Sequence, residues 1–243
     1  MLFHFKDKFP QLAPYWDKYL EFQKRMEVPA KTVLLAEGKV SGNYIFIEKG
    51  CIRLAFNNNG NDKTVQFFFE NEGLTSFESF LKNTPSLFTI ETIEPSVVYL
   101  LPKVYVNKLM TELSHEPDFV KLILEVSAER QLHYMHEFVS FIRDTPEQRY
   151  QNLLNERPYI VKRVPQHYIA SYLGISRVHL SRIKAPLPER SNQKTFGNIC
   201  YRPALPHHLT LYQQKRKKDE SSSNVSKRGI TPICRFPGAN RSK

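Results

Sequence analysis

Arg177 and Arg182 stand in a short segment whose residue types suit contact with a nucleic acid. A guanidinium group forms paired hydrogen bonds with guanine, and Ser, Gln and His side chains donate to phosphate oxygens. The segment from Gln166 to Lys184 contains all of these residue types. Its chemistry therefore favours base and phosphate contact.

The same segment predicts two short helices joined by a tight turn. Such a pair needs a small residue where the helices cross, which Ala170 supplies, and a residue that tolerates positive φ in the turn, which Gly174 supplies. Ser176 is a suitable N-cap for the second helix. The apolar residues expected to face inward are Ile169, Leu173, Ile175, Leu180 and Ile183.

With those residues turned inward, the polar side chains face outward. Arg177 is the best candidate for direct contact with a base, and Arg182 for a base or a phosphate. The predicted DNA-binding residues are Gln166, His167, Ser176, Arg177, Val178, His179, Ser181 and Arg182. Two helices around such a turn also occur in bundles that bind no DNA.

The preceding chain must position this segment. Residues 1–27 alternate aromatic and charged residues at helical spacing, which predicts a short amphipathic helix. Residues 28–101 contain short β-rich runs separated by Gly and Asn, which predict a compact antiparallel β unit. Asn59-Gly60, flanked by runs of period two, predicts a tight hairpin.

Helical spacing replaces the strand pattern after Pro102. We expect a short helix at residues 104–113 and a long one at 116–142. A further helix should begin with Thr145 as its cap and Pro146 at its first position, and another should begin at Pro165. An apolar stripe along the long helix favours helix pairing. It consists of Leu124, Ala128, Leu132, Met135, Val139 and Ile142.

This order of elements resembles the Crp/Fnr superfamily of bacterial regulators. The residues that carry the resemblance are Tyr44 to Leu54 and Val164 to Arg182, and it extends over about residues 20–184. It implies an α+β fold: an N-terminal antiparallel β-roll that is jelly-roll-like, a long dimerisation helix and a C-terminal helix-turn-helix. The composition after Lys184 predicts a disordered basic tail in addition. The implied partners are double-stranded DNA, a second copy of the chain, RNA polymerase and an unidentified small-molecule effector.

The implied domains are a β-roll sensor at residues 1–101, linking and dimerisation helices at 102–143, a DNA-binding domain at 144–184 and a basic tail at 185–243. Residues 1–184 are nearly neutral, with 23 Lys and Arg against 21 Asp and Glu. Residues 185–243 have 12 against 3. Most of the net charge of +11 therefore lies in the tail. The tail is the product of an altered reading frame, an additional phosphate-binding segment or a plain solvated tail.

The chain departs from the cyclic-AMP-binding members of that superfamily. Those members hold the cyclic phosphate with an arginine, and neither residues 74–80 nor 85–91 contain one. Cyclic nucleotide sensing is therefore not expected. Ser76, Glu78 and Thr89 are weak candidates for contact with another ligand, with Glu78 as a solvated loop acid. In the second helix Val178 replaces a common Glu, and Pro186 should end that helix after about nine residues.

Other classes of function find little support. The sequence contains no apolar run long enough for a membrane span and no secretory signal, so we expect a cytoplasmic protein. Cys51, Cys200 and Cys234 should be free thiols, and no cofactor or metal is predicted. His133 and His136 could hold a metal, but such a pair is usually polar surface.

Two other classes of protein fit parts of the sequence. A cupin-like metalloenzyme needs histidines inside its barrel, and none lies between residues 5 and 114, so we expect no enzyme. The remaining alternative is a dimeric ligand-binding or scaffold module whose DNA binding is impaired by the aberrant C-terminus.

Overall fold

The computed structural model describes residues 13–185, all within one compact unit. The tail predicted to be disordered, together with Cys200 and Cys234, lies outside the described residues. The strands are β1 (Lys24–Val28), β2 (Val33–Leu35), β3 (Asn43–Lys49), β4 (Ile52–Asn58), β5 (Asn61–Phe68), β6 (Gly73–Leu74), β7 (Thr89–Thr92) and β8 (Ser96–Pro102). The helices are α2 (Ala13–Leu20), α3 (Phe77–Lys82), α4 (Lys103–Leu113), α5 (Pro117–Arg143), α6 (Pro146–Glu156), α7 (Pro158–Arg163), α8 (Gln166–Tyr172) and α9 (Arg177–Lys184).

The strands form two antiparallel four-stranded sheets, in the orders β1-β8-β3-β6 and β2-β7-β4-β5. Aliphatic and aromatic residues from both sheets fill the space between them, among them Ile47, Ile52, Phe68 and Ile90. Alternation along each strand directs these side chains to the inner faces. The predicted antiparallel β unit is thus confirmed, and its arrangement is consistent with a β-roll.

The predicted hairpin is confirmed as the β4–β5 connection. Asn58 pairs with Asn61, which leaves Asn59 and Gly60 as a two-residue loop. Both residues have positive φ, 51° and 83°, as a tight hairpin turn requires. The pairing shifts register between Leu54 and Ala55, so β5 contains a bulge near Thr64.

Three local predictions were wrong or incomplete. Residues 24–28 form strand β1 along the edge of β8, whereas the sequence pattern had extended a helix to residue 27. Glu78 lies on helix α3 rather than in a loop. Residues 146–163 form two helices because Pro158 follows a break at Arg157, whose φ and ψ are −134° and 57°.

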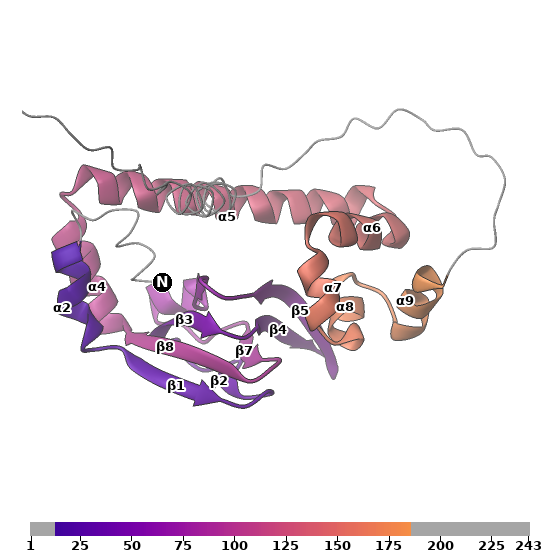
Figure 1. Ribbon diagram of the computed structural model, residues 1–243, viewed down its shortest axis with the longest axis horizontal. Helices are drawn as coiled ribbons and strands as arrows, with labels where there is room; N and C mark the ends of the chain where they lie inside the picture. Colours follow the sequence, from indigo (N-terminus) through magenta and orange to yellow (C-terminus); the bar gives the residue numbers. More distant parts are fainter. Residues whose placement is uncertain (1–12, 186–243) are drawn as a thin grey trace, which may run out of the picture. The chain divides into compact units, whose positions relative to one another are not determined.

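The predicted long helix is confirmed as α5, with 27 residues. Figure 1 shows α2 and α4 side by side near the start of α5, and α6 following its end. A small core fixes the start of α5, and it consists of Tyr19, Leu109, Leu113 and Phe119.

Thr145 caps α6, and its side chain and that of Gln148 form a reciprocal capping box. No helix in the described range is long and apolar enough to cross a membrane.

Gly50 joins β3 to β4 and provides a test of this packing. Its φ is +107°, and a Cβ added there would lie 2.2 Å from Ser96 Oγ and 2.8 Å from Ser96 Cα. We expect Gly50→Ala to lower the free energy of unfolding by about 3 kcal/mol, because strain and overlap add. Urea denaturation measures this. Gly42→Ala is the control, since a Cβ at Gly42 meets nothing within 4 Å; equal stability of the two variants would contradict the packing described.

Candidate nucleic-acid interface

Helices α8 and α9 are joined by a tight turn at Gly174, whose φ is +70°. Ser176 caps α9 by accepting a hydrogen bond from the backbone N–H of His179 at 3.1 Å. Ala170 is buried where the two helices meet. The apolar residues predicted to face inward are buried or partly buried: Ile169, Leu173, Ile175, Leu180 and Ile183. The local geometry predicted from the sequence is therefore confirmed.

The opposite face of α9 is open to solvent. Arg177, Val178, Ser181 and Arg182 are exposed, and Val178 keeps 62% of its surface. Within the part of the chain that the structure describes, neither Arg177 nor Arg182 forms an ion pair. Their guanidinium groups are thus available to an external acceptor. Ala185 has extended backbone angles, so α9 ends at Lys184 after eight residues.

The remaining predicted site residues lie beside this face. Gln166 and His167 are exposed at the start of α8. Partial burial, followed by the positive charges of Arg177, Arg53 and Lys31, lowers the pKa of His167. His179 is half-buried, and its ring nitrogen lies 3.2 Å from Glu147 Oε1, so an acid already occupies one of its nitrogens.

Helix α6 and the end of α5 fix the turn between α8 and α9. Arg149 donates two hydrogen bonds to the carbonyl of Leu173, at 3.3 and 3.0 Å, and one to the carbonyl of Asp144 at 2.7 Å. The ring of Phe141 lies so close to Gly174 that an added Cβ would be 3.1 Å from it. The turn therefore requires glycine both for its φ and for its contact with α5.

Helix α8 also packs directly on the β4–β5 hairpin. Ser171 Oγ accepts a hydrogen bond from the backbone N–H of Thr64 at 2.9 Å and donates one to the carbonyl of Asp62 at 2.9 Å. β5 is the edge strand of its sheet, so the outward N–H of Thr64 and the outward carbonyl of Asp62 face no neighbouring strand. Ser171 satisfies them, so the hairpin and α8 complete each other.

A buried arginine lies beside this contact. The side chain of Arg53 on β4 is only 7% exposed, and it pairs with Glu91 and Asp62 at 2.6 Å each. Its guanidinium lies 4.1 Å from the centre of the Tyr168 ring of α8. A buried charge is costly unless it is paired, so Arg53 ties β5, β7 and α8 together.

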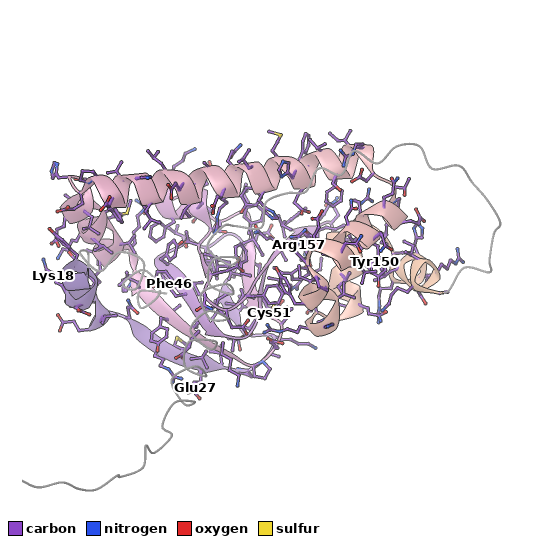
Figure 2. The ribbon with its side chains drawn as sticks, turned by 45° about the horizontal axis from the view of Figure 1, so that its top comes forward. Lys18, Glu27, Phe46, Cys51, Tyr150 and Arg157 are labelled. Carbon is purple, nitrogen blue, oxygen red and sulfur yellow. The ribbon has the colours of Figure 1, made fainter. Side chains whose placement is uncertain are left out.

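A second polar cluster joins α5 to the helices that follow it. Arg157 forms an ion pair with Glu137 of α5 and donates a hydrogen bond to Tyr172 Oη at 2.8 Å. Tyr172 in turn donates to Glu137 Oε2 at 2.6 Å. Burial raises the pKa of Tyr172, which keeps it a hydroxyl donor. Figure 2 shows Arg157 below the ribbon of α5 in that view.

Arg163 at the end of α7 binds two turns of the β unit. It pairs bidentately with Glu70, at 2.8 and 2.7 Å, and also forms an ion pair with Glu94. Burial alone would raise the pKa of Glu70, but the hydrogen bonds from Arg163 and from the backbone, including Gly50, lower it to about 2. Glu70 is therefore a carboxylate at any neutral pH.

The weak ligand candidates lie in a segment that is closed by its own hydrogen bonds. Ser76 is buried and accepts a hydrogen bond from Ser86 Oγ at 2.7 Å, while Ser86 Oγ also bonds to the backbone of Phe88. Thr89 Oγ1 accepts from the backbone N–H of Glu37 at 3.1 Å. Glu78 is exposed and pairs with Lys82, which confirms that it is solvated. These groups face protein partners instead of an open pocket.

Several positioning residues were not identified from the sequence. They are Arg53, Arg149, Arg157, Arg163 and Ser171. One signal was present: Arg53 interrupts the apolar run from Cys51 to Phe56, and a charge at an otherwise buried strand position needs a partner. Of the other four, Arg149, Arg163 and Ser171 lie on helices and Arg157 lies at the break between α6 and α7, and no local pattern marks them.

Comparison with known proteins agrees with this architecture. Residues 25–112 match the family model described as the cyclic nucleotide-binding domain. No curated protein sequence matches the chain significantly.

Solved structures share the fold over most of their length. The c-di-GMP-responsive global regulator CLP of Xanthomonas campestris is 16% identical, with 70% of this chain and 89% of that chain covered and a TM-score of 0.58. FixK2 of Bradyrhizobium japonicum is 13% identical, with 66% and 82% covered and a TM-score of 0.56. CooA of Carboxydothermus hydrogenoformans is 15% identical, with 72% and 83% covered and a TM-score of 0.53. These likenesses show the fold alone, and they agree with the β-roll and following helices that the sequence predicted.

The Arg163 cluster predicts a dependence of stability on pH. Because the pKa of Glu70 is lower in the folded state than its ordinary 4.5, the ionised form stabilises the fold above about pH 4.5, and this contribution is lost as the pH falls towards 2. The side chain is 32% exposed, so screening limits the effect to about 1 kcal/mol. Glu70→Gln should flatten the acid limb of a plot of unfolding free energy against pH. Glu21→Gln, at an exposed position, should leave the slope unchanged.

Proposed function

We propose that the protein is a sequence-specific DNA-binding transcription regulator that acts as a homodimer. The observation that carries this proposal is the open face of α9. Arg177, Val178, Ser181 and Arg182 lie outward on a helix whose other face is packed, and neither arginine has an acidic partner among the described residues. Such a helix can enter a major groove with its N-terminal residues against base edges.

The surroundings of α9 favour a role in DNA binding for these side chains over a purely structural role. Gln166 and His167 at the start of α8 are exposed beside α9 and are the proposed phosphate contacts. Ser176 and the free N–H groups at the start of α9 add donors for a phosphate. The helix-turn-helix assignment, residues 144–184 as the DNA-binding domain and residues 1–101 as the sensor are parts of this proposal.

The proposed homodimer rests on α5. The predicted apolar stripe is exposed along the helix: Leu124, Ala128, Leu132, Met135, Val139 and Ile142. Its spacing of three and four residues is that of paired helices, and an exposed stripe of this length favours association. A two-fold pair of recognition helices would bind a two-fold symmetric DNA site.

The similar structures point in the same direction. CLP is described as a global regulator that links signalling to gene expression, and its fold matches most of this chain. The effector is not expected to be cyclic AMP, because the segment of Ser76 and Ser86 lacks the arginine and closes on itself. RNA polymerase is a further proposed partner. We further propose that the protein is cytoplasmic and has no enzymatic activity.

The second candidate is a dimeric ligand-binding or scaffold module with impaired DNA binding. One observation favours it: α9 has only eight residues, and its extended C-cap at Ala185 precludes further turns. The two functions differ in selection from random DNA. A regulator enriches a palindromic sequence, while the module retains all sequences weakly and equally.

Substitution of the two outward arginines tests the proposal. Arg177→Ala should cost about 1–3 kcal/mol of binding to the selected site and relax the preference at one base pair, because it removes a bidentate base contact. Arg182→Ala should weaken binding with a smaller loss of preference if it binds a phosphate. Fluorescence anisotropy on selected and scrambled duplexes measures both effects.

Lys39→Ala is the matched control, since Lys39 is an exposed cation in the β unit. It should leave affinity and selectivity unchanged. The proposal fails if the Arg177→Ala/Arg182→Ala variant retains full selectivity, or if the intact protein shows none.

The dimer has its own test. Leu132→Arg should convert the protein to a monomer, because it places a charge in the apolar stripe without disturbing a folded monomer in which Leu132 is 58% exposed. Sedimentation equilibrium measures the change, and affinity for a palindromic site should fall with it. Val33→Arg, at an exposed apolar position on β2, should remain dimeric. A dimeric Leu132→Arg variant would exclude the α5 interface.

A further inference from the structure

A tight turn at residues 29–32 joins β1 to β2, and Thr92 of β7 holds its backbone. The N–H of Lys31 donates to the carbonyl of Thr92 at 2.7 Å, and the N–H of Thr92 donates to the carbonyl of Thr32 at 3.0 Å. The Thr92 hydroxyl donates to the carbonyl of Pro29 at 2.8 Å and accepts from the N–H of Thr32 at 2.9 Å. Thr92 is fully buried, so water does not compete for these bonds, and the turn is fixed on the sheet.

Lys31 is the residue that this turn presents to solvent. It is exposed, and its φ is +64°, in the left-handed region that residues other than glycine and asparagine seldom adopt. Among residues 13–185 no carboxylate forms an ion pair with its ammonium group. A fixed backbone therefore presents a positive charge that is open to an external anion.

One row of contacts leads from this turn to helix α8. Val33, just after the turn, pairs in register with Glu91 of β7. Glu91 accepts two hydrogen bonds from the guanidinium of Arg53 on β4, at 2.8 and 2.6 Å. Arg53 lies against the Tyr168 ring, and the centres of the Tyr168 and His167 rings are 3.9 Å apart. The turn and the start of α8 thus lie on the same face of the β2-β7-β4-β5 sheet.

The charges of Lys31 and Arg177 both act on the side chain of His167. Partial burial is the main cause of the lowered pKa of His167, and the charges of Arg177, Arg53 and Lys31 add to it. Solvent screens a charge beyond about 10 Å, so these cations are neighbours of the imidazole. Arg53 is already paired with two acids. Lys31 and Arg177 remain available to an external anion.

The dimensions of DNA suit this placement. The major groove is about 12 Å wide, so phosphates lie about 6 Å to either side of a helix at its centre. Arg177 belongs to the proposed base-reading face, whereas Lys31 stands on a different element, near His167, which is itself a proposed phosphate contact. A lysine ammonium is a point charge on a flexible stem, which suits a phosphate better than the paired acceptors of a base.

We propose that Lys31 binds a phosphate of the DNA backbone, so that the β unit itself takes part in the DNA interface. This inference rests on the proposed function, and it adds a contact outside the proposed DNA-binding domain of residues 144–184. The hydrogen bonds of Ser171 to the β4–β5 hairpin then hold α8 where Lys31 and Arg177 reach the same duplex.

The salt dependence of DNA binding by the full chain tests this contact. Each phosphate contact contributes about 0.9 to the slope of log affinity against log salt concentration. Lys31→Ala should therefore reduce the slope by about 0.9 per bound chain, or about 1.8 per dimer. Affinity for the selected duplex and for a scrambled duplex should fall by the same factor, because a phosphate carries no sequence information. Fluorescence anisotropy over a series of salt concentrations measures both quantities.

Lys39→Ala is the matched control, because it removes the same charge from an exposed position beside Ser86. It should leave the slope unchanged, and Lys31→Arg should keep the wild-type slope. Circular dichroism and thermal unfolding establish that the variants fold. If Lys31→Ala keeps the slope of Lys39→Ala, or loses affinity for the selected duplex alone, the inference is wrong even where Arg177→Ala loses selectivity. If the intact protein shows no selectivity, the proposed function fails as well.

A tethered cleavage reagent locates the contact. Lys31→Cys and Lys39→Cys are each combined with Cys200→Ser and Cys234→Ser, and the added thiol carries an iron chelate that generates hydroxyl radicals. Cys51 is buried and stays unlabelled. We expect Lys31→Cys to cut the backbone of the selected duplex at the edge of each half-site, and Lys39→Cys to leave it intact. Equal cutting by the two chains, or none by either, would overturn the inference.

Discussion

A shared apolar core joins the outer face of the β4–β5 hairpin to the helices after α5. Cys51, Phe67, Phe69 and Ile93 come from the β unit, and they pack in one cluster with Tyr150, Leu153, Tyr168, Ile169, Tyr172 and Leu180. The hydrophobic contribution to stability is proportional to the area removed from water. The β unit and the helices after α5 would therefore each be less stable alone than they are when packed together. The orientation of α9 therefore depends on the β unit.

The polar contacts at the border of this core fix the position of α8 on the sheet. Apolar burial is not directional, so it would allow α8 to slide over the sheet. Ser171 of α8 and Arg163 of α7 oppose this with directional hydrogen bonds to Thr64 and Glu70, and Arg53 opposes it through its contact with the Tyr168 ring. Breaking the Arg53 cluster would leave a buried charge without its partners, which is costly. Buried apolar area thus stabilises the packing of the β unit, α8 and α9. The paired charges fix how these elements are positioned on one another.

Sequence-based prediction succeeded for features that depend on residues close together in the chain, and it failed for features that depend on distant residues. The hairpin at Asn59-Gly60, the cap at Thr145 and the turn at Gly174 were predicted because each depends on residues within a few positions. Strand β1 was missed because residues 24–28 are strand only through pairing with β8, some seventy residues later. The outward face of α9 follows from its periodicity. Its positioning by Arg149 and Arg53 depends on tertiary contacts that no local pattern contains.

The shortness of α9 is compatible with the proposed recognition of DNA. The chain places Pro186 after Ala185, and the residue before a proline avoids helical angles, so the helix ends at Lys184. Recognition helices contact bases chiefly with their N-terminal residues. Arg177, Val178 and Ser181 all lie in the first five positions of α9. The stability that further turns would provide comes here from elsewhere: the Ser176 cap, the buried Leu180 and the contact of Gly174 with Phe141. Anchoring at its start and middle keeps the proposed contact surface rigid although the helix is short.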